Sequence, residues 1–152
     1  MVNESPSCLI GKAAMLSGVS AANIRFYEKQ GLLPVGKRSS NTYRSYGDSD
    51  IHQLRFIRLC RTMDMSLEEV RTLLNLDLRS KTDCATANAT LAAHIEHVQE
   101  RLAELRSLQR DLKDLRGRCD GSGPRCKIME ALHIRAQALS AVSRAAPGHR
   151  HV

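Results

Sequence analysis

The sequence is organised around residues 84–126, which read CATANATLAAHIEHVQERLAELRSLQRDLKDLRGRCDGSGPRC. Between residues 88 and 117, apolar side chains recur every three or four positions, and most of the positions between them are charged or polar. This spacing is typical of the seam of a coiled coil. The seam residues are Leu91, Ile95, Val98, Leu102, Leu105, Leu108, Leu112 and Leu115. The stretch therefore predicts one long dimerisation helix that ends at Gly117.

Three cysteines flank the predicted helix, Cys84 before it and Cys119 and Cys126 after it. About 35 residues separate Cys84 from Cys119, so a straight helix with a rise of ~1.5 Å per residue would hold them ~50 Å apart. Two antiparallel helices would instead bring Cys84 of one chain beside Cys119 and Cys126 of the other. Three thiolates form a site for a soft metal ion. The alternative is that the helix only dimerises the protein and the cysteines are incidental.

The composition narrows the class of protein. The 152 residues carry a formal net charge of +7, which favours a polyanionic partner, and only 3% are aromatic, which favours a helical aliphatic core. The start of the chain does not resemble a secretion signal, and no stretch approaches the ~20 apolar residues of a membrane span. Five cysteines in an apparently cytoplasmic protein favour thiol or metal chemistry over a disulfide framework.

The N-terminal part predicts a winged helix-turn-helix. A short helix over residues 10–16 is followed by a turn at Gly18 and by a second helix from a Ser20 N-cap to residue 30. The second helix would lie in a major groove with its early residues at base edges. Residues 32–46 combine turn residues with basic and aromatic side chains, and predict a small β-hairpin that contacts phosphates as a wing.

Two more helices are expected after the wing, over residues 50–63 and, behind a capping box formed by Ser66 and Glu69, up to about residue 78. Cys60 falls among core positions and is interpreted as buried. The expected fold class is mainly α, with a winged helix-turn-helix, an antiparallel coiled-coil helix, and a metal-binding loop with a short helix. Its parts are a flexible leader at 1–8, the DNA-binding domain at 9–78, a linker at 79–87, the dimerisation helix at 88–117, the metal-binding loop and C-terminal helix at 118–142, and a mobile tail at 143–152.

Several separated motifs resemble the MerR-type transcription regulators. These motifs are Ile10-Gly11, Ile24-Arg25-Phe26-Tyr27-Glu28, Gly31-Leu32-Leu33-Pro34, Asn41-Thr42-Tyr43-Arg44-Ser45-Tyr46, Phe56-Ile57-Arg58 and Met65-Ser66-Leu67-Glu68-Glu69-Val70. Cys84, Cys119 and Cys126 fall where metal-sensing members of that family keep three thiols. The resemblance covers residues 9–132 and adds a specific function to the pattern of helices.

Within the family, the gap between Cys119 and Cys126 and the stretch from His94 to Gln99 resemble the cadmium- and lead-responsive branch. Mercury-responsive members have a longer loop, and the copper-responsive branch lacks a thiol equivalent to Cys84. The redox-sensing branch carries a clustered cysteine motif, and the multidrug-sensing branch carries a separate ligand domain. Neither feature is present in this sequence.

The resemblance implies a homodimer on a palindromic site in double-stranded promoter DNA. Metal binding would bend and untwist that DNA so that RNA polymerase can use the promoter, which is a form of indirect readout. No set of residues suggests an enzyme. The expected DNA contacts, from the groove argument and the resemblance together, are Ser20, Asn23, Arg25, Tyr27, Arg38, Asn41, Tyr43 and Arg44.

The identity of the metal follows only from ligand type and resemblance. Three thiolates suit Cd(II), Pb(II) and Hg(II), whereas Zn(II) would need a fourth ligand. The resemblance places Cd(II) first and Pb(II) next.

The histidines and the thiols leave further hypotheses open. His94 and His97 share one helix face, so with His149 and His151 of the tail they form a hypothetical second metal site. The alternative is that these histidines face solvent. Two other functions remain open, namely a thiol-based redox regulator in which Cys119 and Cys126 form a disulfide, and a metal-buffering protein.

Overall fold

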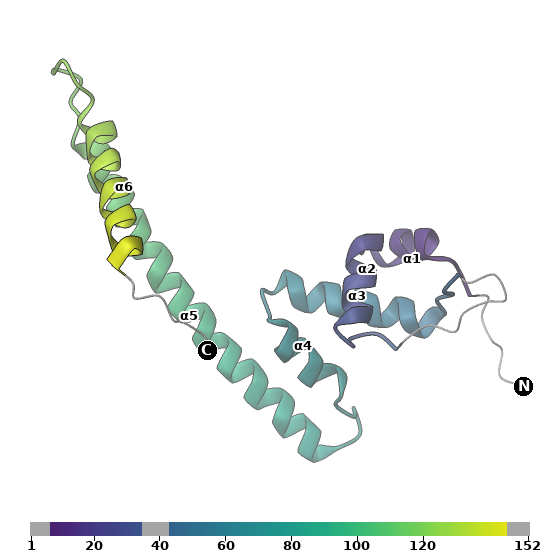
Figure 1. Ribbon diagram of the computed structural model, residues 1–152. Helices are drawn as coiled ribbons and strands as arrows, with labels where there is room; N and C mark the ends of the chain where they lie inside the picture. Colours follow the sequence, from purple (N-terminus) through teal and green to yellow (C-terminus); the bar gives the residue numbers. More distant parts are fainter. Residues whose placement is uncertain (1–6, 35–42, 146–152) are drawn as a thin grey trace, which may run out of the picture. The chain divides into compact units, whose positions relative to one another are not determined.

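The computed structural model describes residues 7–34 and 43–145, and the regular structure within these ranges is helical apart from isolated bridge residues at Cys8, Arg44 and Tyr46. Figure 1 labels the helices in chain order. They are α1 (Ile10–Ser17), α2 (Ala21–Lys29), α3 (Asp48–Thr62), α4 (Leu67–Leu74), α5 (Lys81–Gly117) and α6 (Lys127–Ala145). The expectation of a mainly α protein is therefore confirmed. The chain divides into two compact units, with the boundary between Ile95 and Glu96 inside α5.

In the first unit, α1 and α2 form the predicted helix-turn-helix. Gly18 ends α1 with φ of 72°, and its backbone N–H donates to the carbonyl of Ala14 over 2.9 Å. Ser20 then begins α2 as the N-cap, because its hydroxyl accepts a hydrogen bond from the backbone N–H of Asn23 at 3.2 Å. A left-handed glycine and a serine cap two residues apart produce the sharp turn between the two helices.

The core of this unit is aliphatic and joins α2, α3 and α4. The fully buried side chains include Ile24 of α2, Leu54 and Ile57 of α3, Met65 of the following turn and Val70 of α4. Cys60 is 2% exposed and belongs to the same cluster, which confirms the expectation that it is a buried core residue. Burial raises the pKa of the Cys60 thiol, so it stays protonated and apolar.

The capping box predicted from the sequence is present at the start of α4. The hydroxyl of Ser66 accepts the backbone N–H of Glu69 at 3.2 Å, and Oε2 of Glu69 accepts the backbone N–H of Ser66 at 2.7 Å. These two bonds satisfy donors that a helix start would otherwise leave free. The helix ends at Leu74, earlier than the expected residue 78.

The wing is only partly within the described residues. The hairpin predicted over residues 32–46 includes positions 35–42, which lie outside them. The returning segment is described, and Tyr46 forms an antiparallel bridge with Cys8 through two backbone hydrogen bonds of 2.8 and 2.9 Å. This bridge ties the end of the wing to the segment that precedes α1.

Helix α5 begins at Lys81, so the expectation of a linker over 79–87 with Cys84 ahead of the helix is wrong. The physical reason is a cap at Ser80, whose hydroxyl accepts the backbone N–H of Asp83 at 3.2 Å and whose carbonyl accepts that of Cys84 at 3.0 Å. Cys84 therefore lies in the first turn of α5. No apolar periodicity marks these first residues, which is why the sequence pattern placed the start too late.

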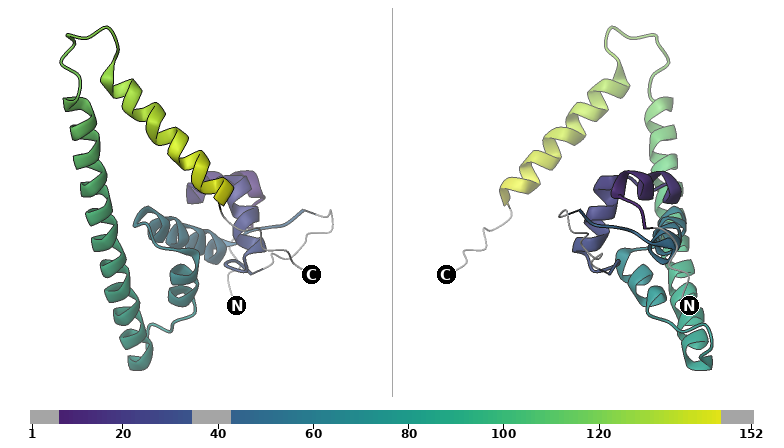
Figure 2. Two further views of the ribbon diagram at one scale, coloured as in Figure 1. Left: turned by 60° about the vertical axis from the view of Figure 1, so that its left-hand side comes forward. Right: turned by 90° about the vertical axis from the view of Figure 1, so that its right-hand side faces the viewer.

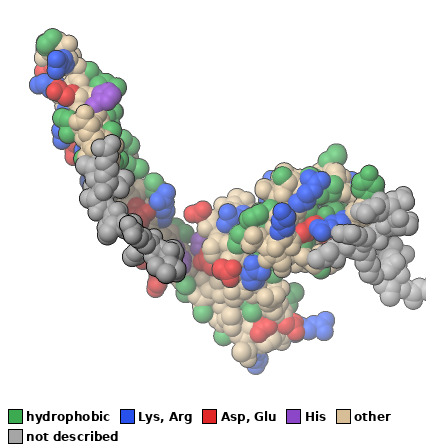
Figure 3. Space-filling model, in the orientation of Figure 1, with side chains coloured by type: hydrophobic (Ala, Val, Ile, Leu, Met, Phe, Trp, Pro, Cys, Tyr) green, Lys and Arg blue, Asp and Glu red, His purple; other side chains and the backbone are tan. Residues whose placement is uncertain are grey.

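The second unit contains the rest of α5, the loop 118–126 and α6. Figure 2 shows α6 leaving the loop at an angle to the end of α5, rather than packing along it. The predicted seam faces solvent in the single chain, except for Leu115, which is 5% exposed. The exposed seam residues are Leu91, Ile95, Val98, Leu102, Leu105, Leu108 and Leu112. Helix α6 also exposes apolar side chains, and Figure 3 shows the green patches along these helices.

No helix among the described residues combines the length and the apolar character that crossing a membrane requires.

Candidate nucleic-acid interface and metal sites

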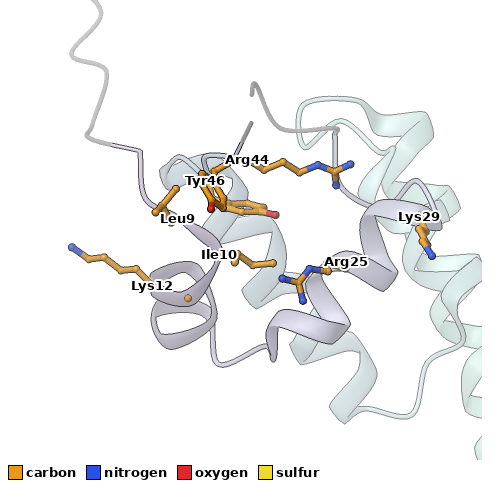
Figure 4. A pocket seen from close by; sticks show the side chains of 9 residues that line it. Leu9, Ile10, Lys12, Arg25, Lys29, Arg44 and Tyr46 are labelled. Carbon is orange, nitrogen blue, oxygen red and sulfur yellow. The ribbon is translucent and has the colours of Figure 1, made fainter. Parts of the chain in front are cut away.

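A hollow of about 630 Å³ lies on the first unit between the start of α1, the outer face of α2 and the returning wing segment. Figure 4 shows how side chains from these three elements surround it. Four cations are among the lining residues. They are Lys12, Arg25, Lys29 and Arg44. A basic hollow beside a helix-turn-helix is a surface on which a phosphate backbone can bind.

The expected DNA contacts are distributed unevenly over this unit. Arg25 lines the hollow, and Tyr43 also lines it with 67% of its surface exposed. Asn23 is exposed near the start of α2, whereas the hydroxyl of Ser20 is engaged in capping. Tyr27 is only 8% exposed and packs in the core. Arg38 and Asn41 lie outside the described residues.

Arg44 differs from the other expected contacts because it forms an ion pair with Glu28, a buried carboxylate in the last turn of α2. Sequence reasoning did not find this pair. It also missed Lys12 and Lys29, although the positive charge of both residues on the first two helices was a signal that could have found them.

A second, smaller hollow of about 260 Å³ lies at the turn between α1 and α2. Its lining includes the Ser20 cap, Asn23 and two guanidinium groups from α3, those of Arg58 and Arg61. The free N–H groups at the start of a helix carry partial positive charge, so this corner also favours an anion.

Two of the three predicted metal thiols lie in the loop between α5 and α6. Hydrogen bonds from the backbone N–H groups of Met129 and Ile128 hold the pKa of the Cys126 thiol below its ordinary value, and Cys119 contributes in the same direction. Cys126 thus stands at the start of α6, where a thiolate is stabilised by the helix amides. Cys119 is half-buried and Cys126 is exposed.

The loop itself is closed by Asp120. Its Oδ1 accepts hydrogen bonds from the backbone N–H and the hydroxyl of Ser122, at 3.0 and 2.6 Å, and these bonds hold the pKa of the Asp120 carboxyl below its ordinary value. Gly121 follows with φ of 76°, a conformation that glycine adopts without strain. This turn folds the chain back so that Cys119 interacts with Cys126. Cys84, the third thiol, is exposed in the first turn of α5.

His94 belongs to the first unit and is 9% exposed, and both nitrogens of its ring have contacts there. Its Nε2 lies 2.9 Å from the carbonyl oxygen of Met63, and its Nδ1 lies 3.1 Å from Oε1 of Glu69. A carbonyl only accepts, so Nε2 carries a proton and donates it. Metal-binding histidines usually anchor one ring nitrogen in this way and offer the other to the ion.

His97 follows one helical turn later on α5, and its ligand atom lies within 4.8 Å of that of His94. His149 and His151 lie outside the described residues. Glu69 is a residue that the sequence reasoning missed as a candidate ligand. Its capping role was readable from the local motif, but its contact with His94 on another helix was not.

The electrostatics around Glu69 favour its charged form. Burial by itself would raise the pKa of the Glu69 carboxyl, but hydrogen bonds from the backbone and the hydroxyl of Ser66, together with the nearby His94, outweigh burial and lower that pKa. A carboxylate that is ionised beside an anchored imidazole is a suitable ligand pair for a divalent cation.

A helix-turn-helix with basic hollows on an otherwise helical unit defines a DNA-binding transcription regulator. The chain belongs to the MerR family: residues 8–77 match the family described as MerR HTH family regulatory protein, and residues 51–115 match the one described as MerR, DNA binding. The expectations of a MerR-type regulator and of a protein that is not an enzyme are confirmed.

Two similar relatives and one similar structure illustrate the match. HTH-type transcriptional regulator HmrR of Sinorhizobium medicae is 38% identical over 81% of this chain and 84% of its own length. Heavy metal-dependent transcription regulator 2 of Rhizobium meliloti is 37% identical over the same shares. The structure of PbrR691 from Ralstonia metallidurans, solved in complex with lead(II), is 40% identical, covers 82% of this chain and 98% of its own, and superposes with a TM-score of 0.69.

Proposed function

We propose that this protein is a metal-responsive transcription regulator that binds promoter DNA as a homodimer and activates metal-resistance genes. The observation that carries the proposal is the placement of two cysteines, Cys119 and Cys126, by the loop 118–126, which sets Cys126 directly before the first turn of α6. Hydrogen bonds from the backbone N–H groups of that turn lower the pKa of the Cys126 thiol and so favour its thiolate. A thiolate is the form that binds a soft metal. The relatives named above include a heavy metal-dependent regulator and a protein solved with lead(II), which supports the same response here.

Dimerisation through α5 supplies the third ligand in this proposal. The seam of α5 leaves seven apolar side chains in water in the single chain, and a second copy of the same helix is a partner that would cover them. In an antiparallel pair, Cys84 of the partner subunit completes a three-thiolate site with Cys119 and Cys126. Cd(II) is the proposed ion, followed by Pb(II); the same thiolates also suit Hg(II), and Zn(II) would need a fourth ligand in addition to them.

The transcriptional step is the distortion of DNA. Metal binding at the ends of the paired helices changes the spacing of the two DNA-binding units, which bends and untwists the promoter so that RNA polymerase engages it. A duplex carrying a donor and an acceptor dye would report this change. We expect Cd(II) to alter the transfer efficiency of the bound duplex without releasing the protein, whereas release would indicate a simple repressor.

A second metal site is proposed at His94 and His97, with Glu69 as an added carboxylate and with His149 and His151 from the tail. Its support is the anchored orientation of His94 and the 3.1 Å separation between Nδ1 and Oε1 of Glu69. This site would take a harder ion than the thiolate site, because nitrogen and oxygen ligands suit Zn(II).

The test is an ultraviolet titration of the reduced protein with Cd(II), following thiolate-to-metal charge transfer. Cys84→Ser, Cys119→Ser and Cys126→Ser should each reduce the signal, and Cys8→Ser, outside the proposed site, should not. Mixed dimers of Cys84→Ser with Cys119→Ser should recover one of their two sites. If Cys84→Ser titrates as the wild type does, the shared site is excluded, and the loop alone holds the metal.

The second candidate function is a thiol-based redox regulator, and the closeness of Cys119 to a stabilised Cys126 thiolate also favours it. Oxidation would then form a Cys119–Cys126 disulfide with the loss of two protons and two electrons to a disulfide oxidant such as oxidised glutathione. Mass measurement under non-reducing conditions detects that loss of two hydrogens. A disulfide that changes DNA binding in the absence of metal would favour the redox function. A metal buffer is less consistent with the helix-turn-helix domain, since buffering requires no DNA-binding unit.

A further inference from the structure

The carboxylate of Glu28 is buried beneath the basic hollow of the first unit. Its side chain is 2% exposed, although it stands in the last turn of α2, two residues from the start of the turn that follows. Two side chains from the returning wing segment bind it. Arg44 forms an ion pair with it, and the hydroxyl of Tyr46 donates a hydrogen bond to Oε1. Figure 4 shows Arg44 and Tyr46 beside α2.

Tyr46 is itself held firmly. It is 3% exposed, and its backbone forms the two hydrogen bonds to Cys8 that make the β-bridge. Burial raises the pKa of the Tyr46 hydroxyl, so this group remains a neutral donor to Glu28 at neutral pH. The end of the wing is therefore fixed at its backbone by Cys8 and at its side chains by Glu28.

A buried carboxylate depends on these partners. An ionised group out of water is strongly destabilising unless it is paired and hydrogen-bonded. If Arg44 moved to a DNA phosphate, Glu28 would keep only the tyrosine hydroxyl. The two charges also cancel, so the pair adds no net positive charge to the hollow, unlike Arg25 and Lys29 on the outer face of α2.

We propose that Glu28 is the positioning residue that fixes the wing to α2, and that Arg44 is its internal partner and not a phosphate ligand. The inference rests on the proposed DNA binding and corrects one of the contacts that the family resemblance implied. It means that the recognition helix and the wing segment 43–46 bind DNA as one rigid surface, whose charge comes from other residues.

Salt dependence of DNA binding separates this role from a phosphate contact. Each phosphate that a protein neutralises contributes about −0.9 to the slope of log K against log salt concentration for a duplex. The probe is a fluorescent duplex selected from a random pool by the wild-type protein. The key variant is the double replacement Glu28→Gln with Arg44→Gln, which removes both charges and keeps a side chain that can accept from Tyr46.

We expect the double variant to keep the wild-type slope and Arg25→Gln, the matched control on the hollow, to flatten it by about 0.9. Glu28→Gln alone should steepen the slope by a similar amount, because it releases the Arg44 charge. If the double variant flattens the slope as Arg25→Gln does, Arg44 is a phosphate ligand and the proposal is wrong.

Unfolding in urea tests the contact between Glu28 and Arg44 without DNA. Glu28→Gln and Arg44→Gln should each lower the unfolding midpoint by more than the double variant does, since each single change leaves one charge without its partner. Additive effects would overturn the proposal even in a protein that binds no duplex. If the wild type selects no duplex but the effects of the two single changes on unfolding are not additive, the DNA-binding function is refuted. The contact between Glu28 and Arg44 would then still stand.

Discussion

Nε2 of His94 on α5 donates a hydrogen bond of 2.9 Å to the carbonyl oxygen of Met63, the C-cap residue of α3. On its other side, the same ring faces Glu69 in the first turn of α4. One imidazole on α5 therefore joins the end of α3 to the start of α4.

We predict that His94→Ala destabilises the metal-free protein by about 1–3 kcal/mol, because it removes the hydrogen bond to the Met63 carbonyl and the contact with the Glu69 carboxylate. Urea unfolding in the presence of a chelator measures the change. His133→Ala, on an exposed turn of α6, is the matched control and should change stability by less than about 0.5 kcal/mol. Equal effects of the two variants would show that the His94 contacts carry no net stability.

Gly18→Ala should destabilise the first unit by about 1–2 kcal/mol, since Gly18 has φ of 72° and a left-handed conformation is unfavourable for alanine. The added Cβ would also lie 2.2 Å from Nη1 of Arg58, so that this side chain must move. Gly11→Ala is the control, because Gly11 lies within α1 with nothing within 4 Å of the new Cβ, and this change should stabilise by about 0.5 kcal/mol. Thermal unfolding gives the melting temperature of each variant. Equal melting temperatures for Gly18→Ala and Gly11→Ala would contradict the prediction.

Leu105→Arg should separate the proposed dimer. Leu105 stands near the middle of the α5 seam and is 47% exposed in the single chain, and a charge buried at that position of a coiled coil is strongly unfavourable. Sedimentation equilibrium should show that the dissociation constant of the dimer rises at least tenfold, which corresponds to about 1.4 kcal/mol. Ser107→Arg, outside the seam, adds the same charge and should leave the dimer unchanged. Loss of the dimer in both variants would point to overall charge as the cause.

Cys126 should react with iodoacetamide at lower pH in the folded protein than in urea. The amides of Met129 and Ile128 lower the pKa of its thiol in the folded state, so the thiolate fraction at a given pH is higher there. Mass spectrometry of the peptide that contains Cys126, taken over a pH series, gives the inflection in each condition. Coincident inflections would mean that the start of α6 does not stabilise the thiolate.

Alkaline pH should weaken the first unit through Tyr46. Burial raises the folded pKa of this tyrosine above its ordinary value of 10.0, so its contribution to stability is complete below that value and falls as the pH rises through the folded pKa. Urea midpoints measured between about pH 8 and about pH 11 should decline less steeply at the alkaline end in Tyr46→Phe than in the wild type.

Structural features that depend only on residues close together in the sequence were predictable. The α5 seam, the Ser20 cap, the left-handed Gly18 and the capping box of Ser66 with Glu69 each depend on residues within a few positions, and the structure contains all of them. The early start of α5 was missed because a serine cap in a polar segment gives no periodic signal.

Contacts between distant residues were not predictable in the same way. Glu28 carries an ordinary surface charge in the sequence, and only the return of the wing onto α2 buries it against Arg44. The contact between Glu69 and His94 likewise depends on how α5 lies against the turn after α3. Periodicity gives the face of a helix, but not which residue of another element will oppose it.

The exposed seam of α5 has a consequence for how the proposed regulator depends on its own concentration. If the proposed dimer forms, the seven apolar side chains that the single chain leaves in water are covered only by a second copy, so the stability of the protein depends on its concentration. In the dimer proposed here, the metal site is assembled from both copies, so sensing also begins only above a threshold number of molecules per cell. A newly made chain at low copy number would neither hold the metal nor persist, and the regulator would set a lower limit on its own working population.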